Sequence, residues 1–231
     1  MSSSASSVFT RLFYEPRSAF ESLRENSKPW LPLSLILVST IAMLYWYFAT
    51  VDFAWLLDHT LSAKPDMKPE ERAMVTGMMT KNSMMWSSLG GTLIGMPLVF
   101  ALYGLYFLLA SKIMGSTIGF GKWFSFAIWT SVPTLIGVPL MALQIITGHG
   151  QVSMEGLNML SLNFLITNFS PDHAWAGLMN NLSLTTFWTM FLSFIGLRVW
   201  TGRSVATCVI ATALPYTLIY GAWIVKLVFF K

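Results

Sequence analysis

The sequence predicts an all-α membrane protein: a bundle of five transmembrane helices preceded by amphipathic helices at the membrane interface. Composition is the first observation behind this prediction. Of the 231 residues, 55% are hydrophobic and only 10% are charged, and the mean hydropathy is +0.61. A water-soluble globule of this size has too little interior to bury so much apolar surface. The chain is therefore expected to have lipid as its main solvent.

Long stretches without Lys, Arg, Asp or Glu are the second observation. Five of them have at least 22 residues, and they are 29–51, 82–111, 123–154, 173–197 and 204–225. A hydrocarbon core about 30 Å thick needs roughly 20 apolar residues per helix. Their uniform apolar character favours helices over alternating barrel strands. The predicted spans are about 30–51, 85–111, 123–146, 177–197 and 204–226, within a membrane domain at 29–231. The shorter, asparagine-containing stretch 156–171 is expected to lie at the interface.

Basic residues at the ends of these stretches are the third observation, and they predict the orientation. Eight Lys or Arg residues fall on one side of the predicted membrane: Arg11, Arg17, Arg24, Lys28, Lys112, Lys122, Arg198 and Arg203. On the other side, four basic residues (Lys64, Lys68, Arg72 and Lys81) are outnumbered by acidic ones, among them Asp66. Cytoplasmic loops carry the excess of Lys and Arg. The amino terminus is therefore predicted to be cytoplasmic and the carboxyl terminus periplasmic, although Lys226 and Lys231 at the outer end disagree.

The segment before the first span has apolar residues at helical spacing. Residues 1–6 are expected to be disordered, and 7–28 to form two short amphipathic helices with a hinge at Glu15 and Pro16. They are predicted to lie on the cytoplasmic leaflet, as an anchor for the first span or as a docking surface for a partner. The residues proposed for this surface are Phe9, Arg11, Phe13, Arg17, Phe20 and Arg24.

The outer loop and the second span supply two further expectations. Pro69, followed by two acidic residues, predicts the start of a helix that continues into the second span. Gly91 and Gly95 have the spacing that permits close approach of helices, and packing within the same bundle is favoured over a seam between two copies of the chain.

Prolines well inside the second, third and fifth spans suggest a binding site at the bilayer centre. Each proline removes a helical hydrogen bond, and small polar residues lie close to it in sequence. The proposed site residues are Pro97, Thr130, Ser131, Pro133, Thr134, Thr212, Pro215 and Tyr216. Transporters build sites in this way, but the same pattern also occurs in helices that only pack. Proton or ion coupling is not expected, because these spans contain no charged residue.

Signals for catalysis, metals and nucleic acid are weak or missing. The sequence has no nucleophile elbow, zinc-protease motif or phosphate-binding loop. We therefore expect no enzymatic activity and no cofactor. Methionines at 74–85 and three histidines could bind Cu(I), but they lack ligand spacing, and no metal site is predicted. Basic residues form no soluble stripe, so nucleic acid is not an expected partner.

Three patches of the sequence resemble the Yip-domain family, membrane proteins named for their Ypt/Rab-interacting eukaryotic members. The patches are Phe-Tyr-Glu-Pro-Arg-Ser-Ala-Phe at 13–20 with Trp-Leu-Pro-Leu at 30–33, Gly-Phe-Gly-Lys-Trp-Phe-Ser at 119–125 with Thr-Ser-Val-Pro at 130–133, and Gly-Leu-Arg-Val-Trp-Thr-Gly at 196–202. The resemblance implies five spans, a cytoplasmic amino terminus and an outward carboxyl terminus. A Rab partner does not transfer, because the Asp-Leu-Tyr-Gly-Pro type motif is missing, and the short amino-terminal tail is similar to the bacterial branch.

These observations lead to two functional hypotheses. The first is a non-enzymatic protein of the bacterial inner membrane that binds membrane proteins or lipids, as a scaffold or accessory subunit. The second is a transporter, or a subunit of one, for lipid or a neutral small solute through the midplane site. Expected partners are the lipid bilayer and membrane proteins, and association with a second copy of the chain is left open.

Overall fold

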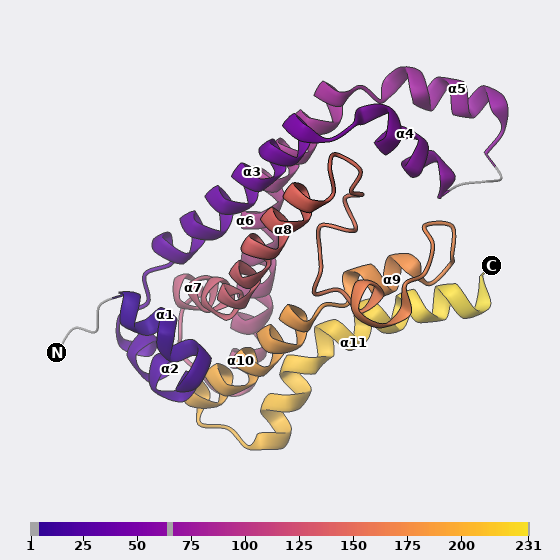
Figure 1. Cartoon of the computed structure of the whole chain (residues 1–231). Coiled ribbons are helices and arrows are strands. Elements are labelled where there is room, and N and C mark those ends of the chain that lie inside the picture. The colour runs from indigo at the N-terminus through magenta and orange to yellow at the C-terminus, as the bar shows by residue number, and fades with distance from the viewer. Residues whose placement is uncertain (1–4, 64–66, 231) are drawn as a thin grey trace. The chain divides into compact units, whose positions relative to one another are not determined.

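The computed structural model describes residues 5–63 and 67–230, and its regular elements are helices (Figure 1). They are α1 (Ala5–Tyr14), α2 (Pro16–Glu25), α3 (Trp30–Thr50), α4 (Phe53–Ser62), α5 (Pro69–Met78), α6 (Lys81–Ile113), α7 (Phe120–Thr130), the 3-10 segment η1 (Val132–Ile136), α8 (Gly137–Thr147), the π-type turn η2 (Asn163–Thr167), α9 (Ala176–Asn181), α10 (Leu184–Thr201) and α11 (Val205–Phe229). Residues 1–4 of the predicted disordered start lie outside the described residues, as do Lys64, Asp66 and Lys231 of the charge argument.

Among the described residues, four helical stretches are long and apolar enough to cross a membrane. They are Trp30–Thr50, Lys81–Ile113, Phe120–Thr147 and Val205–Phe229. In α6 and α11 only 17% of the most apolar window is buried inside the protein, so most of their apolar surface faces outward. Lipid is the solvent that such a surface requires. The predicted fourth span corresponds to α10, which is not among these four, so a fifth crossing stays a prediction.

The chain divides into two compact units, of which unit one holds the candidate site. Unit one comprises the described residues up to Ile36, Met96–Thr134 and those from Thr185 onward. Its core contains an aromatic cluster with ring centroids 5.0 to 6.0 Å apart. The cluster consists of Phe20 from α2, Phe107 from α6, Trp123 and Phe126 from α7, and Trp200 from α10. The Trp200 Nε1 donates a hydrogen bond of 2.9 Å to the Phe20 carbonyl, which fixes α2 to α10.

Unit two comprises Leu37–Gly95 and Leu135–Leu184. Its core consists of Tyr47, Phe48, Val51, Leu56, Ile145 and Leu157. At the end of α3, the Tyr47 hydroxyl donates to the Val152 carbonyl at 2.9 Å, and the Lys81 ammonium donates to the carbonyls of Ala49 and Val51. The bonds from Lys81 satisfy carbonyl groups that the end of α3 leaves without partners.

The helix predicted from Pro69 into the second span is interrupted, and this expectation is corrected. It ends at Met78, and α6 begins at Lys81. Between them, Thr80 and Ser83 form a reciprocal cap, in which each backbone N–H donates to the other residue's hydroxyl, at 3.0 and 3.1 Å. Such a cap starts a new helix, because it satisfies N–H groups that lack a carbonyl partner one turn earlier.

The predicted span 177–197 is also divided, into α9 and α10. Leu182 is extended, and Ser183 forms an isolated antiparallel β-bridge with Ser161. The Leu162 N–H donates to the Leu182 carbonyl at 2.7 Å, and the Leu184 N–H to the Leu160 carbonyl at 2.9 Å. The long apolar helix therefore begins at Leu184 and continues to Thr201.

Candidate functional site

A cavity lined by hydroxyl groups lies in unit one, among α6, α7, α10 and α11. Its volume is about 220 Å³. Ten of its lining residues carry a hydroxyl group: Tyr103, Thr130, Ser131, Thr134, Thr185, Thr186, Thr189, Ser193, Tyr216 and Tyr220. Val99, Phe100, Phe107 and Ala127 complete the lining. None of these lining residues is charged. The cavity is thus polar without being ionic.

Four of the eight residues proposed for the midplane site line this cavity. They are Thr130, Ser131, Thr134 and Tyr216. The other four, Pro97, Pro133, Thr212 and Pro215, do not line it. Pro133 and Thr212 are buried, and the prolines at 97 and 215 lie inside α6 and α11. Figure 1 shows that α11 bends along its length rather than running straight, as a proline within a helix favours.

The largest contribution that the sequence argument missed comes from α10. Thr185, Thr186, Thr189 and Ser193 line the cavity. Residues 185, 189 and 193 are four apart, so they share one face of the helix. This spacing is visible in the sequence, but α10 contains no proline, and the predicted site was based on the spans that contain prolines.

Hydrogen bonds of the lining hydroxyls are mostly directed at the helix backbone. Thr130 donates to the Ala127 carbonyl at 3.0 Å, Ser131 to the same carbonyl at 2.9 Å, and Thr134 to the Ser131 carbonyl at 2.7 Å. Each hydroxyl oxygen can still accept a hydrogen bond. Hydrogen bonds of this kind, from a hydroxyl to a backbone carbonyl three or four residues earlier, are common for Ser and Thr in helices.

Three tyrosines form the other polar wall. The ring centroids of Tyr103 and Tyr216 are 6.1 Å apart, and those of Tyr216 and Tyr220 are 6.5 Å apart. Together with the rings of Phe100 and Phe107, this wall offers aromatic surface as well as hydrogen bonds. A cavity of this kind suits an uncharged ligand with a few polar atoms.

A model of the Yip1 domain matches residues 10–225. The chain belongs to the Yip1 domain family. No curated protein and no solved structure matches it. The match covers the cavity, α2 and the second half of α1, and it agrees with the family that the sequence patches resemble. Family membership and the apolar helices identify a multi-pass membrane protein.

The amino-terminal surface of the Yip1 domain needs a correction. Phe20 was proposed as a surface residue, but it is completely buried, and its ring contacts that of Phe126 at 5.5 Å. Phe9 packs on Trp129 with centroids 5.0 Å apart, and Phe13 lies 6.2 Å from Trp188. The apolar face of α1 and α2 is therefore directed at the other helices of unit one. Packing there removes its apolar surface from water, which is favourable.

The three arginines proposed for the same surface have different environments. Arg17 and Arg24 are exposed, whereas Arg11 is half-buried. The Arg11 side chain donates to the Ser18 hydroxyl at 3.0 Å and to the Ser7 carbonyl at 3.2 Å. Arg11 thus joins α1 to α2, and the polar face of α2 is the part of this segment that is open to solvent or to a partner.

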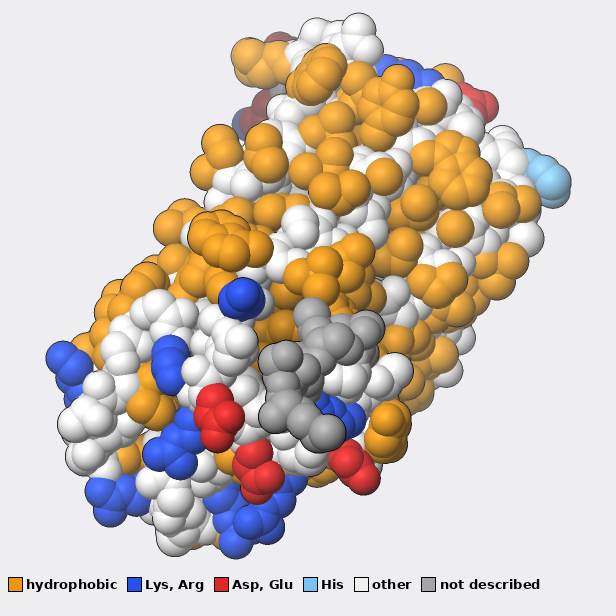
Figure 2. All heavy atoms as spheres, turned by 90° about the vertical axis from the view of Figure 1, so that its left-hand side faces the viewer, with side chains coloured by type: hydrophobic (Ala, Val, Ile, Leu, Met, Phe, Trp, Pro, Cys, Tyr) orange, Lys and Arg blue, Asp and Glu red, His pale blue; other side chains and the backbone are white. Residues whose placement is uncertain are grey.

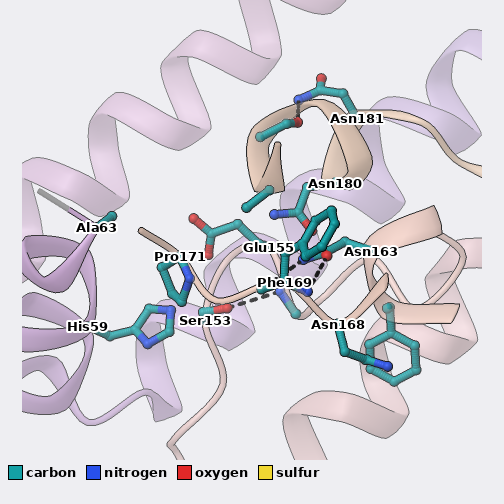
Figure 3. A pocket seen from close by; sticks show the side chains of 14 residues that line it. His59, Ala63, Ser153, Glu155, Asn163, Asn168, Phe169, Pro171, Asn180 and Asn181 are labelled. Carbon is teal, nitrogen blue, oxygen red and sulfur yellow. Dashed lines mark hydrogen bonds between the residues drawn. The ribbon is translucent and has the colours of Figure 1, made fainter. Parts of the chain in front are cut away.

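Unit two of the Yip1 domain has a second hollow, of about 470 Å³, which Figure 3 shows from close by. Asn163 organises its wall: the side-chain oxygen accepts from the Phe169 N–H and the Thr167 hydroxyl, both at 2.8 Å, and the side-chain amide donates to the Phe169 carbonyl. Glu155 and His59 also face this hollow (Figure 3). Because the Asn163 amide is used within its own loop, we regard this hollow as the result of loop structure.

Proposed function

We propose that this member of the Yip1 domain family is a non-enzymatic protein that binds an uncharged ligand in the hydroxyl-lined cavity. The ligand class is a neutral lipid or a neutral small solute. The observation that supports this best is the concentration of hydroxyl groups in the uncharged lining of this cavity. Polar groups in membrane helices are expensive unless they find partners, so their gathering at one cavity favours a binding role. Members of the family are not known as enzymes.

The proposal includes a membrane topology. It has five crossings, with α10 as the fourth, a cytoplasmic amino terminus and a periplasmic carboxyl terminus in a bacterial inner membrane. Support comes from the eight basic residues of the connections assigned to the cytoplasm. The residues that α10 presents to the cavity also support its place within the membrane.

Reconstituted protein tests ligand binding. A photoactivatable diacylglycerol is incorporated into liposomes with the purified protein, and crosslinked peptides are identified by mass spectrometry. We expect crosslinks to peptides of α10 and α11, and a several-fold loss in the variants Thr189→Val and Tyr216→Phe, since each removes a hydroxyl with little change of volume. Thr217→Val is the matched control, because Thr217 is exposed on α11 and does not line the cavity.

Solute transport is measured in the same liposomes. Swelling in glycerol, recorded by light scattering, should be faster with the protein than without it if the cavity conducts a neutral solute. Crosslinking without faster swelling supports a lipid-binding role only. Absence of both, or equal loss in Thr217→Val, would contradict the proposed binding site.

A scaffold role is the second candidate, and the exposed end of α1 favours it. Tyr14 is 68% exposed and lies beside the half-exposed Phe13. Tyrosine is enriched at protein interfaces. If this segment docks a membrane-protein partner, Tyr14→Ser should reduce the partners recovered after crosslinking in native membranes, whereas Tyr45→Ser, at another exposed tyrosine, should not. Deletion of residues 1–26 is a poorer test, because it would uncover the buried Phe126 and Trp200.

A further inference from the structure

A recess with arginines on its wall lies in unit one, between α2 and the carboxyl end of α10. Its volume is about 650 Å³. Arg17 and Arg24 come from α2, Arg198 from α10, and Arg203 from the link to α11. Figure 2 shows Lys and Arg side chains gathered at one end of the visible face, around α1 and α2. All four arginines belong to connections that the charge pattern assigns to the cytoplasm.

The positive charge of this recess is not balanced by its own acids. Four arginines line it with two glutamates, Glu21 and Glu25, which gives a net formal charge of +2. Arg17 forms an ion pair with Glu21 at 3.2 Å, but both side chains are largely exposed. Such pairs contribute little to stability. The pair can therefore give way to a stronger anion.

The guanidinium groups have unused donors. Arg203 donates to the Met114 carbonyl, a neutral acceptor that orients the group without cancelling its charge. Within the described ranges, the guanidinium groups of Arg24 and Arg198 make no hydrogen bond or ion pair. A guanidinium has five N–H donors in a planar fork. Several like charges around one recess with free donors favour the binding of an anion.

The shape and polarity of the recess indicate which anion. Phe194, Ile195 and Val199 of α10 line the side opposite α2, and they are half-buried. The ligand should therefore have an apolar part next to its charge. Paired guanidinium donors match the oxygens of a phosphate. A net positive wall repels the ammonium group of a zwitterionic lipid and accepts an anionic one.

We propose that this recess binds the phosphate of an anionic phospholipid, with Arg24 and Arg198 as the principal ligands and Arg17 and Arg203 as supporting charges. The acyl chains would lie along the apolar side residues of α10. The inference does not rest on the function proposed for the hydroxyl-lined cavity, since the two share no lining residue. The two tests can therefore fail separately.

The test uses the full-length protein in a neutral detergent. The midpoint of thermal unfolding is measured against the concentration of short-chain phosphatidylglycerol, since a ligand that binds the folded state raises this midpoint. We expect saturable stabilisation, and in Arg24→Gln/Arg198→Gln an apparent Kd that is about tenfold higher or more, as loss of charge-assisted hydrogen bonds implies. Arg72→Gln is the matched control, because Arg72 lies on α5 in unit two, and its Kd should stay within about twofold.

Two other probes decide the source of the phosphate. Short-chain phosphatidylcholine should stabilise the protein weakly, and equal stabilisation would overturn the preference for an anionic lipid. Equal stabilisation by inorganic phosphate would overturn the lipid assignment in favour of the free ion. An unchanged Kd in the double glutamine variant would overturn the site itself.

A variant that keeps the charge addresses the role of the guanidinium fork. Arg24→Lys/Arg198→Lys should bind with an affinity between those of the parent and the glutamine variant, because lysine supplies the charge without paired donors. Full recovery by lysine would overturn the assignment of paired donors. The lysine variant also provides the comparison if the glutamine variant unfolds at a lower temperature without lipid.

Discussion

Single glycines allow helices of unit one to approach closely. A Cβ on Gly104 of α6 would lie 2.8 Å from the Phe124 Cα, and one on Gly196 of α10 would lie 2.5 Å from the Phe126 ring. In contrast, a Cβ on Gly91 or Gly95 would meet nothing within 4 Å. The close approach predicted from the spacing of Gly91 and Gly95 is therefore wrong for the part of the chain that the structure describes. The contacts occur at glycines without that spacing.

Alanine at Gly196 should destabilise unit one. The added methyl group would contact the rings of Phe20 and Phe126, which are fully buried and cannot move aside. Overpacking of this kind costs about 1–3 kcal/mol. We expect a lower midpoint of thermal unfolding in detergent for Gly196→Ala. Gly221→Ala on α11 is the control, because its Cβ meets nothing and alanine favours helix by about 0.5–1 kcal/mol; a similar loss in both variants would contradict the packing argument.

Tyr47 and Tyr45 provide a matched pair for the hydrogen bond in unit two. The Tyr47 hydroxyl is buried and donates to the Val152 carbonyl, whereas Tyr45 is 56% exposed on the same helix. Tyr47→Phe removes the donor and leaves a carbonyl without it, which costs about 1–3 kcal/mol. Tyr45→Phe should change stability by less than about 0.5 kcal/mol. Denaturation of both variants, measured by intrinsic fluorescence in the same detergent, should separate them; equal stabilities would show that the bond contributes nothing.

At the scale of elements, α2 differs from a free amphipathic helix because it packs against the other helices of unit one. Phe20→Ala removes a completely buried ring and should cost about 3–5 kcal/mol. We expect α2 to detach, so that trypsin cleaves after Arg17 and Arg24 faster in membranes. Phe13→Ala, at a residue that is 39% exposed, should leave the cleavage rate close to that of the parent. Equal rates in the two variants would indicate that α2 is held by something other than Phe20.

The elements also show where sequence reasoning succeeds and where it stops. The boundary between α1 and α2 follows from Pro16 at a helix start and from apolar residues at helical spacing, both local signals. The break before α10 depends on a β-bridge between Ser161 and Ser183, residues far apart in sequence. The burial of Phe20 depends in the same way on Trp200 and Phe126. Local patterns predict helices, but not which partner covers them.

The same division applies to the candidate site. Thr130, Ser131 and Thr134 line the cavity and are predictable from the sequence, because they lie next to Pro133 in the third predicted span. Thr185 and Thr189 were missed because membership of one cavity depends on how α10 faces α6 and α11. Thr212 is also buried, and its hydroxyl has no hydrogen-bond partner among the described residues. No local pattern in the sequence predicts this burial.

At the scale of the whole molecule, the chain passes between its two units several times. The passages fall within α3, between Gly95 and Met96 in α6, after Thr134, and at the start of α10. Pro97 and Pro133 lie within two residues of two of these points. Both prolines, which were predicted as residues of the midplane site, thus lie beside a change of unit and do not line the cavity.

The chain has five crossings if the two ends of α10 lie on opposite sides of the membrane, and four if they lie on the same side. Cys208 is the only cysteine of the sequence and is buried, so Cys208→Ala gives a background without reactive thiols. Single cysteines are then introduced at Asp172, before α10, and at Val205, after it; both positions are exposed. If α10 crosses the membrane, an impermeant maleimide added to intact cells should label Asp172→Cys and spare Val205→Cys.

Permeabilised cells provide the control, in which both cysteines should react. Gln151→Cys and Thr117→Cys flank the segment Phe120–Thr147 and calibrate the assay, because that segment is long and apolar enough to cross. Labelling of Gln151→Cys alone from outside would also place the basic connection at 112–122 in the cytoplasm, as its lysines predict. Labelling of Asp172→Cys and Val205→Cys from the same side would reduce the count to four. The carboxyl terminus would then lie on the same side as the amino terminus, and the recess around Arg198 would lose its assignment to the inner leaflet.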